Sequence, residues 1–347
     1  MARRALGPAT LTLVQAVESS LVATDRCLLV ACSGGPDSLA LSQAVVHVGR
    51  RRGLPIAALI VDHGLQPSSS DQAARAASAL TSLGFEHVVV RAVDVIDTGS
   101  GPEADARTAR YRALELEAGE RGGATVVLGH TRDDQAESVL LGLARGSGTR
   151  SLAGMAVRSG HNGCWLRPLL GVGRGVTEQA CRENGLVPWQ DPHNLDPAYA
   201  RVRVRRTVLP LLEAELGPGI AEALARTAML ARDDADLLDA LAADADPGTA
   251  ELACVRVESL PPALRRRVLA RWLRLEHGLA DLSAGHLFAV DALLTDWHGQ
   301  SGVDLPGGVR VRRIEGRLHL APTEAARVYR SRSIYRPSRT AEPEQIG

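Results

Sequence analysis

Residues 33–38 form the segment of this chain whose side chains could most readily do chemistry. They read Ser-Gly-Gly-Pro-Asp-Ser, after a short apolar run over 27–32 and before a run with helical spacing over 39–46. Adjacent glycines let the backbone come close to a ligand, and the free amides at the start of a helix favour an anion. The segment therefore predicts a phosphate-binding loop between a strand and a helix. A plain strand-to-helix turn capped by Ser33 or Asp37 is the alternative.

The loop differs from two familiar nucleotide-binding motifs. The chain contains no lysine, so all 40 of its basic residues are arginine and a Walker A motif is excluded. The spacing of the glycines is not that of a dinucleotide fold either. The loop resembles instead the pyrophosphatase loop, Ser-Gly-Gly-x-Asp-Ser, of enzymes that split ATP between its α and β phosphates to adenylate an oxygen. This resemblance indicates a superfamily and ATP, but no particular substrate.

Two further polar clusters follow apolar runs that have the length of buried strands. Asp62 and His63 follow the run 56–61, and residues 129–138 follow the run 125–128. Helical patterns separate these runs, so we expect an α/β fold with a doubly wound parallel sheet covered by helices on both faces. Since ligands bind at the carboxyl ends of such strands, the three clusters should meet in one crevice. The alternative is that each cluster, considered separately, only caps a helix and that His63 has only a structural role.

Acidic residues in these clusters suit a metal ion that accompanies a triphosphate. Magnesium (Mg2+) takes oxygen ligands and keeps several waters, so Asp37 with Asp133 or Asp134 can hold it between phosphate oxygens. Adjacent residues do not share a helix face, so one of Asp133 and Asp134 can cap the helix while the other faces the ligand. Helix capping alone is the alternative. His130 and Glu137 are two helical turns apart and can face the same space.

Composition and cysteine usage limit the class of protein. With 347 residues, 45% of them apolar, and a net charge of zero, we expect more than one globular domain and at most a local nucleic-acid surface. The five cysteines form no C-x-x-C pair, which favours buried thiols and a reducing, cytoplasmic location over a metal site. We expect neither a signal peptide nor a membrane span.

The alternation of strands and helices stops near residue 215, so residues 1–215 are predicted to be the ATP-binding catalytic domain. Within this domain, residues 146–163 contain many glycines and should be irregular. Arg201 and Arg205 share a helix face and form a basic flank suited to phosphate or RNA. A merely solvated surface is the alternative for these two arginines. Residues 216–321 predict a smaller, mainly helical C-terminal domain with short strands at its end. Residues 322–347 predict a basic tail, either disordered or an arm for RNA.

Taken in order, the motifs resemble those of the tRNA(Ile)-lysidine synthetases. Besides the loop they are Val61-Asp62-His63-Gly64-Leu65, Ala109-Arg110-Tyr111, residues 130–137, Arg167-Pro168-Leu169-Leu170, Asp191-Pro192-His193-Asn194, and Arg201-x-Arg203-x-Arg205 with Leu209-Pro210. The resemblance covers roughly residues 25–215. The later helices and Leu305-Pro306-Gly307-Gly308 resemble the shorter form of the family, which has one small C-terminal domain.

The resemblance implies an adenine nucleotide α hydrolase-like fold and a defined reaction. ATP adenylates the C2 carbonyl oxygen of the wobble cytidine of a tRNA(Ile) with a CAU anticodon, and free L-lysine displaces AMP to give lysidine. The resemblance places ATP and Mg2+ at Ser33, Gly34, Gly35, Pro36, Asp37 and Ser38, with Asp134 as a second metal ligand and Asp62 and His63 beside the adenosine. It implies as catalytic residues Asp37, His130, Asp133 and Asp134, and as substrate-binding residues Arg110, Glu137, Arg201 and Arg205.

Two other functions stay open at the level of sequence. A tRNA thiolase of the same superfamily delivers sulfur to an adenylated base, but such an enzyme is expected to carry paired cysteines. A nucleotide-binding or RNA-binding module without turnover gains nothing from the carboxylates at 133, 134 and 137. The sequence does not decide between a monomer and a homodimer.

Overall fold

The computed structural model of the protein describes residues 5–64, 68–99, 101–146, 148–279 and 282–323. Their contacts divide the chain into two compact units, one formed by residues up to Arg232 without 146–149 and the other by 146–149 and the residues from Asp233 on. The sequence placed the boundary at 215, whereas this division falls inside a long helix, α10 (Ile220–Ala245). The basic tail expected after residue 321 lies, from residue 324 on, outside the described residues, as does Leu65.

The larger unit is built on a six-stranded sheet whose strands follow the apolar runs of the sequence. The strands are β1 (Leu28–Ala31), β2 (Ile56–Asp62), β3 (His87–Ala92), β4 (Thr125–Leu128), β5 (Arg158–Ser159) and β6 (Trp165–Leu166). Their order is β3-β2-β1-β4-β6-β5, and neighbours are parallel except for β5 with β6. The expected parallel α/β fold is therefore confirmed. The direction of strand addition reverses between β1 and β4, where ligands bind in such sheets.

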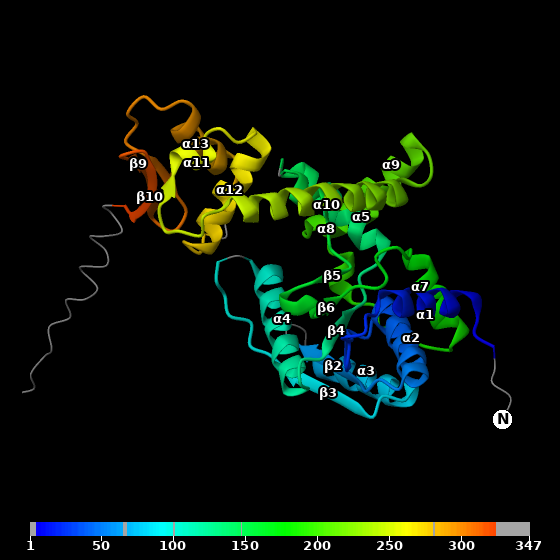
Figure 1. Ribbon diagram of the computed structural model, residues 1–347. Helices are drawn as coiled ribbons and strands as arrows, with labels where there is room; N and C mark the ends of the chain where they lie inside the picture. The colour runs from blue at the N-terminus through cyan, green and yellow to red at the C-terminus, as the bar shows by residue number, and fades with distance from the viewer. Residues whose placement is uncertain (1–4, 65–67, 100, 147, 280–281, 324–347) are drawn as a thin grey trace, which may run out of the picture. The chain divides into compact units, whose positions relative to one another are not determined.

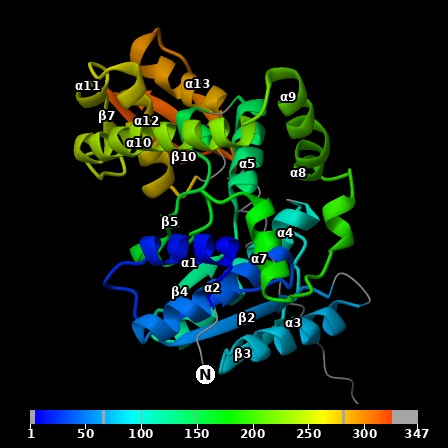
Figure 2. The same cartoon turned by 90° about the vertical axis from the view of Figure 1, so that its right-hand side faces the viewer.

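Alternate residues of each strand supply separate cores on the two faces of the sheet. The first face, to which Leu28 and Val30 point, is covered by α1 (Pro8–Ser20), α2 (Pro36–Arg52), α3 (Ser69–Leu83) and α7 (Arg174–Glu183). Leu29 points to the other face, against α4 (Pro102–Glu120). These strand residues are fully buried, and each contributes about 2 kcal/mol to folding. Figures 1 and 2 show α1, α2 and α7 side by side.

Helix α5 (Arg132–Ala144) is packed by the segment that follows α7. Along that segment lie η2 (Pro192–Leu195), α8 (Ala200–Arg203), the π-helical turn η3 (Val204–Val208) and α9 (Leu209–Leu216). Ala136 of α5 is buried against Val204 and Leu209. Ile220 and Leu224 at the start of α10 join the same cluster, so the first turns of that helix belong to the larger unit. This packing explains why the division falls later than residue 215.

Residues 146–163 contain more regular structure than their glycines indicated. They include α6 (Thr149–Leu152), strand β5 and the short helix η1 (His161–Gly163). The expectation of an irregular stretch was wrong in this respect. Gly160, with φ of +82°, and Gly163, with φ of +68°, adopt left-handed conformations that turn the chain from β5 to β6. The glycines therefore form a hairpin turn.

The smaller unit combines short helices with an antiparallel sheet. Its elements are α11 (Cys254–Val257), α12 (Pro262–Leu275), α13 (Ala284–Thr295) and the strands β7 (Leu252–Ala253), β8 (Val303–Leu305), β9 (Val309–Ile314) and β10 (Arg317–Pro322), in the sheet order β7-β10-β9-β8. Trp272 of α12 is fully buried in the core of this unit. Arg265 and Asp291 form a buried ion pair between α12 and α13 (Nε to Oδ1, 2.5 Å). Within the described ranges, no helix is long and apolar enough to cross a bilayer.

The buried carboxylate of Asp25 links β4 and β5 near one edge of the large sheet. Its carboxylate accepts hydrogen bonds from the Thr125 hydroxyl (2.6 Å), the Arg158 guanidinium (2.8 Å) and the Val22 N–H (2.8 Å). Burial acts to raise the pKa of Asp25, but the bonds from Arg158 and Thr125 outweigh it and lower that pKa below the ordinary 3.8. The ionised carboxylate therefore joins the start of β4 to the β5 hairpin.

Replacing Asp25 by Asn should lower the free energy of unfolding of the larger unit by about 2 kcal/mol, because the partly buried Arg158 charge loses its partner. The loss should be equal at about pH 6 and about pH 8, since Asp25 is ionised there in both the folded and the unfolded chain. It should shrink below pH 3.8, where the unfolded chain takes up the proton first. Denaturant titration measures the effect, with the exposed Asp94→Asn as control; equal stability of the Asp25 variant and the parent at neutral pH would contradict it.

Candidate active site

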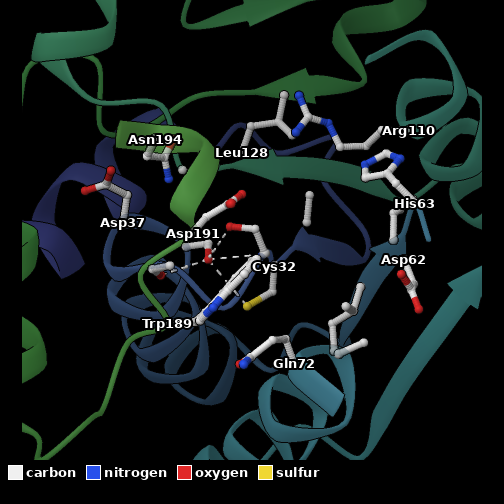
Figure 3. Close-up of a pocket in the computed structure, with 18 of the residues that line it drawn as sticks. Cys32, Asp37, Asp62, His63, Gln72, Arg110, Leu128, Trp189, Asp191 and Asn194 are labelled. Carbon is white, nitrogen blue, oxygen red and sulfur yellow. Dashed lines mark hydrogen bonds between the residues drawn. The ribbon is translucent and has the colours of Figure 1, made fainter. Parts of the chain in front are cut away.

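A cavity of about 410 Å³ opens at the carboxyl ends of β1, β2 and β4, where the strand order reverses. Its wall includes Cys32, Asp62 and His130, which lie at or just after the ends of these strands. Figure 3 shows Asp37 on one side of the cavity and Asp62 with His63 on the other. The three polar clusters of the sequence therefore meet in one cavity, as expected for a parallel sheet.

The loop at residues 33–38 is held in shape by a hydroxyl group of its own. The Ser38 hydroxyl accepts a hydrogen bond from the Ser33 N–H (3.2 Å) and donates one to the Gly35 carbonyl (3.0 Å). Gly34 has φ of +79°, a conformation that side chains disfavour, and its carbonyl accepts a hydrogen bond from the Trp189 N–H (2.9 Å). Helix α2 begins directly after the loop, so its N-terminus borders the cavity. The unpaired amides and dipole of that terminus favour a phosphate group.

Asp37 lies in the first turn of α2 and is tied to helix α7. The Thr177 hydroxyl donates to its Oδ1, and Arg174 Nε lies 3.5 Å from its Oδ2. Burial raises the pKa of Asp37 above its ordinary value, although Thr177 and Arg174 act against this. An additional cation beside this carboxylate would therefore be stabilising.

Asp133 and Asp134 do not divide capping and ligand-facing roles between them as the sequence analysis expected. Asp134 both caps α5 and faces the cavity: its Oδ2 accepts hydrogen bonds from the Thr131 N–H (2.8 Å) and hydroxyl (3.0 Å), and its Oδ1 contacts Arg174 (3.0 Å) and Arg205 (3.1 Å). Asp133 accepts the backbone N–H of Arg174 at 2.8 Å and so fixes the start of α7. Burial acts to raise the pKa of Asp134, but Arg174 and the Thr131 N–H overcome it and lower that pKa.

Glu137 is fully buried behind the arginines that line the cavity. Arg205 holds it with two hydrogen bonds, Nε to Oε1 at 2.6 Å and Nη2 to Oε2 at 3.1 Å, and Arg201 Nε lies 3.8 Å from Oε2. Arg203 instead donates to the backbone carbonyls of Pro197 and Ala198. Arg201 and Arg205 thus share a face and Arg203 lies off it, as predicted. Burial raises the pKa of Glu137 despite the hydrogen bonds and charge of Arg205.

The two histidines at the cavity carry no charge at neutral pH. Burial lowers the pKa of His130 to about 3, although the charge of Asp134 acts in the opposite direction. Burial, followed by the charge of Arg110, also lowers the pKa of His63. Nδ1 of each ring is buried and has no hydrogen-bond partner among the described residues. Each ring is therefore an uncharged group at the cavity whose Nδ1 is shielded from solvent.

Most of the residues predicted for the site line the cavity directly. They are Ser33, Gly35, Pro36, Asp37, Ser38, Asp62, His63, Arg110, His130, Asp134, Arg201 and Arg205. Gly34, Asp133 and Glu137 lie behind this surface and support it through Trp189, Arg174 and Arg205.

Two residues of α7 at the site were not predicted. The guanidinium of Arg174 lies between Asp37 and Asp134, and its Nη2 is also 3.7 Å from Glu137 Oε1. Thr177, one helical turn later, donates to Asp37. The position of Arg174 was a usable signal, because a cation in the first turn of a helix opposes the helix dipole and must be held by acidic groups from elsewhere.

Comparisons with known proteins match both parts of the chain. The PP-loop domain family matches residues 9–212, and the TilS substrate binding domain family matches residues 252–319. A tRNA(Ile)-lysidine synthase from Thermobifida fusca is 53% identical over 297 residues, which cover 84% of this chain and 90% of the relative. One from Streptomyces coelicolor is 51% identical over 301 residues, covering 85% of each chain. The chain belongs to the tRNA(Ile)-lysidine synthase family.

A solved structure outside the tRNA(Ile)-lysidine synthase family shares the fold. The U34-tRNA thiolase NcsA from Methanococcus maripaludis, with its 4Fe-4S cluster, superimposes with a TM-score of 0.51. The match covers 63% of this chain and 78% of the thiolase, at 18% sequence identity. At this identity the likeness extends to the fold alone.

Gly129 packs closely against the loop, and this packing allows the proposed ATP site of this lysidine synthase family member to be tested. A Cβ at Gly129 would lie 3.2 Å from backbone atoms of Asp37 and Ser38. Gly129→Ala should therefore push the start of α2 and weaken ATP binding by roughly tenfold, with the fold intact. Gly119→Ala is the matched control, because its added Cβ would have no atom of the described residues within 4 Å apart from those of its own helix turn. Calorimetric titration with a non-hydrolysable ATP analogue measures the effect, and equal affinities of the two variants would contradict it.

Proposed function

We propose that the protein ligates free L-lysine to C2 of the wobble cytidine of the tRNA(Ile) with a CAU anticodon, with ATP as co-substrate. The product is lysidine, which changes the codon and the amino-acid identity of that tRNA. Family membership, with matches in both parts of the chain, is the observation that carries the proposal. The cavity supports it, because a phosphate-binding loop, acidic groups and arginines line one space.

The first step adenylates the C2 carbonyl oxygen of the cytidine. The oxygen attacks the α phosphorus of ATP, the bond from this phosphorus to the bridging oxygen breaks, and pyrophosphate leaves with the electron pair. The N-terminus of α2, with the Gly35 amide beside it, would stabilise the charge on the departing pyrophosphate. The uncharged ring of His130 can hydrogen-bond to the reacting phosphate from the end of β4. Asp62 and His63, which line the cavity at the end of β2, would border the adenosine.

The residues present also suit a magnesium ion that accompanies ATP. Asp37 Oδ2 and Asp134 Oδ1 lie within 3.5 Å and 3.0 Å of the same guanidinium, so one cation can contact both. Carboxylate oxygens are the ligands that magnesium prefers, and it commonly adds phosphate oxygens and waters. Bound there, the ion would neutralise phosphate charge. Asp133 would support the site by holding the start of α7.

The second step joins lysine to the activated base. The lysine amine attacks C2, and the bond between C2 and the adenylated oxygen breaks, so AMP leaves with that oxygen. Arg110, Arg201 and Arg205 line the cavity and can bind the lysine carboxylate. The amine must first lose a proton, and Glu137 suits this role because burial raises its pKa. Contact with the lysine amine requires Glu137 to exchange part of its bonding with Arg205.

Purified protein with ATP, magnesium, L-lysine and the CAU-anticodon tRNA transcript should produce AMP, pyrophosphate and lysidine in equal amounts. Mass analysis of nucleosides from the treated tRNA measures the lysidine directly. Omitting lysine should abolish the modified base. A product that requires a sulfur donor in place of lysine would move the protein to the thiolases. Binding of ATP and tRNA without any modified base would indicate a module without turnover.

Asp37→Asn should reduce lysidine formation by at least about a thousandfold, because it removes a charge beside the reacting phosphates. Affinity for the tRNA should change little, since Asp37 lies within the ATP-binding part of the cavity. Asp71→Asn is the matched control: Asp71 also occupies the first turn of a helix, α3, and is exposed. Single-turnover kinetics and a tRNA filter-binding assay separate the two effects. An Asp37 variant with the parent's rate would remove this residue from the site.

A further inference from the structure

We propose that the Arg174 guanidinium is a resident cation that occupies the metal position between Asp37 and Asp134 in the nucleotide-free protein and yields it when ATP brings magnesium. The inference rests on the proposed function for the roles of these two carboxylates. Arg174 would then be a positioning residue that makes the protein bind metal together with ATP and resist metal without ATP.

The contacts of Arg174 place one positive charge where two elements present acidic groups. Nε is 3.5 Å from Asp37 Oδ2 at the start of α2, and Nη2 is 3.0 Å from Asp134 Oδ1 at the start of α5. Nη2 also lies 3.7 Å from Glu137 Oε1. The side chain is 19% exposed, so its charge is poorly screened by solvent. A guanidinium in this place satisfies carboxylates that would otherwise repel each other.

The backbone of Arg174 is fixed while its side chain reaches into the cluster. Asp133 accepts the Arg174 N–H (2.8 Å), and the Thr177 hydroxyl oxygen, which donates its proton to Asp37, lies 2.7 Å from the Arg174 carbonyl oxygen. A long side chain on a fixed base can exchange one anionic partner for another without movement of the helix. Since α2 begins beside Asp37, a phosphate bound at its N-terminus lies within the same neighbourhood.

The charges of the cluster explain why metal and nucleotide should arrive together. Asp37, Asp133, Asp134 and Glu137 lie around Arg174, Arg201 and Arg205, so the group carries only one net negative charge without a metal ion. A divalent ion alone would have to displace Arg174 and leave a surplus of positive charge. ATP brings more negative charge than the ion cancels, and it offers the displaced guanidinium a phosphate partner. The cluster therefore disfavours free metal and accepts the metal–ATP complex.

Manganese binding to the nucleotide-free, full-length protein tests the inference. Arg174→Met keeps the apolar stem and removes the charge, so it should bind Mn2+ about tenfold or more tightly than the parent protein does. Arg182→Met, on the exposed part of the same helix, should leave the Mn2+ affinity unchanged. Electron paramagnetic resonance of free Mn2+ gives both affinities. The double variant Arg174→Met, Asp37→Asn should lose the increase in Mn2+ affinity, which would show that the ion binds at Asp37.

An Arg174→Met protein that binds Mn2+ no more tightly than the parent would overturn the inference, because Arg174 would then be only a structural tie. Thermal unfolding checks that Arg174→Met is folded. If Arg174→Met does not fold, Arg174→Gln, which keeps hydrogen-bonding groups without charge, is used in its place. A non-hydrolysable ATP analogue should raise Mn2+ affinity strongly in the parent and much less in the variant. These measurements use neither tRNA nor lysine, so they succeed or fail independently of lysidine formation.

Discussion

The architecture of the site depends on the hydrogen bonds and ion pairs of one buried carboxylate, that of Asp134. One oxygen accepts both the N–H and the hydroxyl of Thr131 and so sets where α5 begins. The other oxygen contacts Arg174 of α7 and Arg205 of the π-helical turn. A single group thus fixes three elements that come from distant parts of the chain. An uncompensated charge in this place would be costly, so the arginines and the capped helix require one another.

The parallel sheet explains why much of the site could be predicted from sequence. Apolar runs identify strands, and the polar residues just after them must appear at one edge when the strands are parallel. This reasoning brought together the loop at 33–38, Asp62 and His130, which line the same cavity. Their convergence needs no knowledge of packing detail. It follows from strand direction and from the reversal of strand order between β1 and β4.

Features that depend on side-chain partners could not be predicted in this way. The spacing Thr131-x-x-Asp134 is a capping-box signal for Asp134 that was not used, whereas the role of Asp133 depends on where α7 lies. Arg174 was missed because its partners are remote in sequence from its own position. Helix α13 shows a different limit: its apolar residues are spread around the helix, so its sequence shows no amphipathic period. In each case the missing information is which residues lie next to these side chains in three dimensions.

The nucleophilic groups that the chain itself carries near this cavity bear on which nucleophile can react there. The thiols near this cavity are poorly suited to the role: burial raises the pKa of Cys32, and burial with the charge of Asp37 raises that of Cys181 to about 11. The cations are equally unsuited, because the chain has no lysine and a guanidinium stays protonated. An adenylated base held here therefore meets no competing nucleophile among these thiols and guanidinium groups. This agrees with the proposed attack by an external amine, for which the buried Glu137 behind Arg205 would supply a base without exposing a rival nucleophile at the cavity wall.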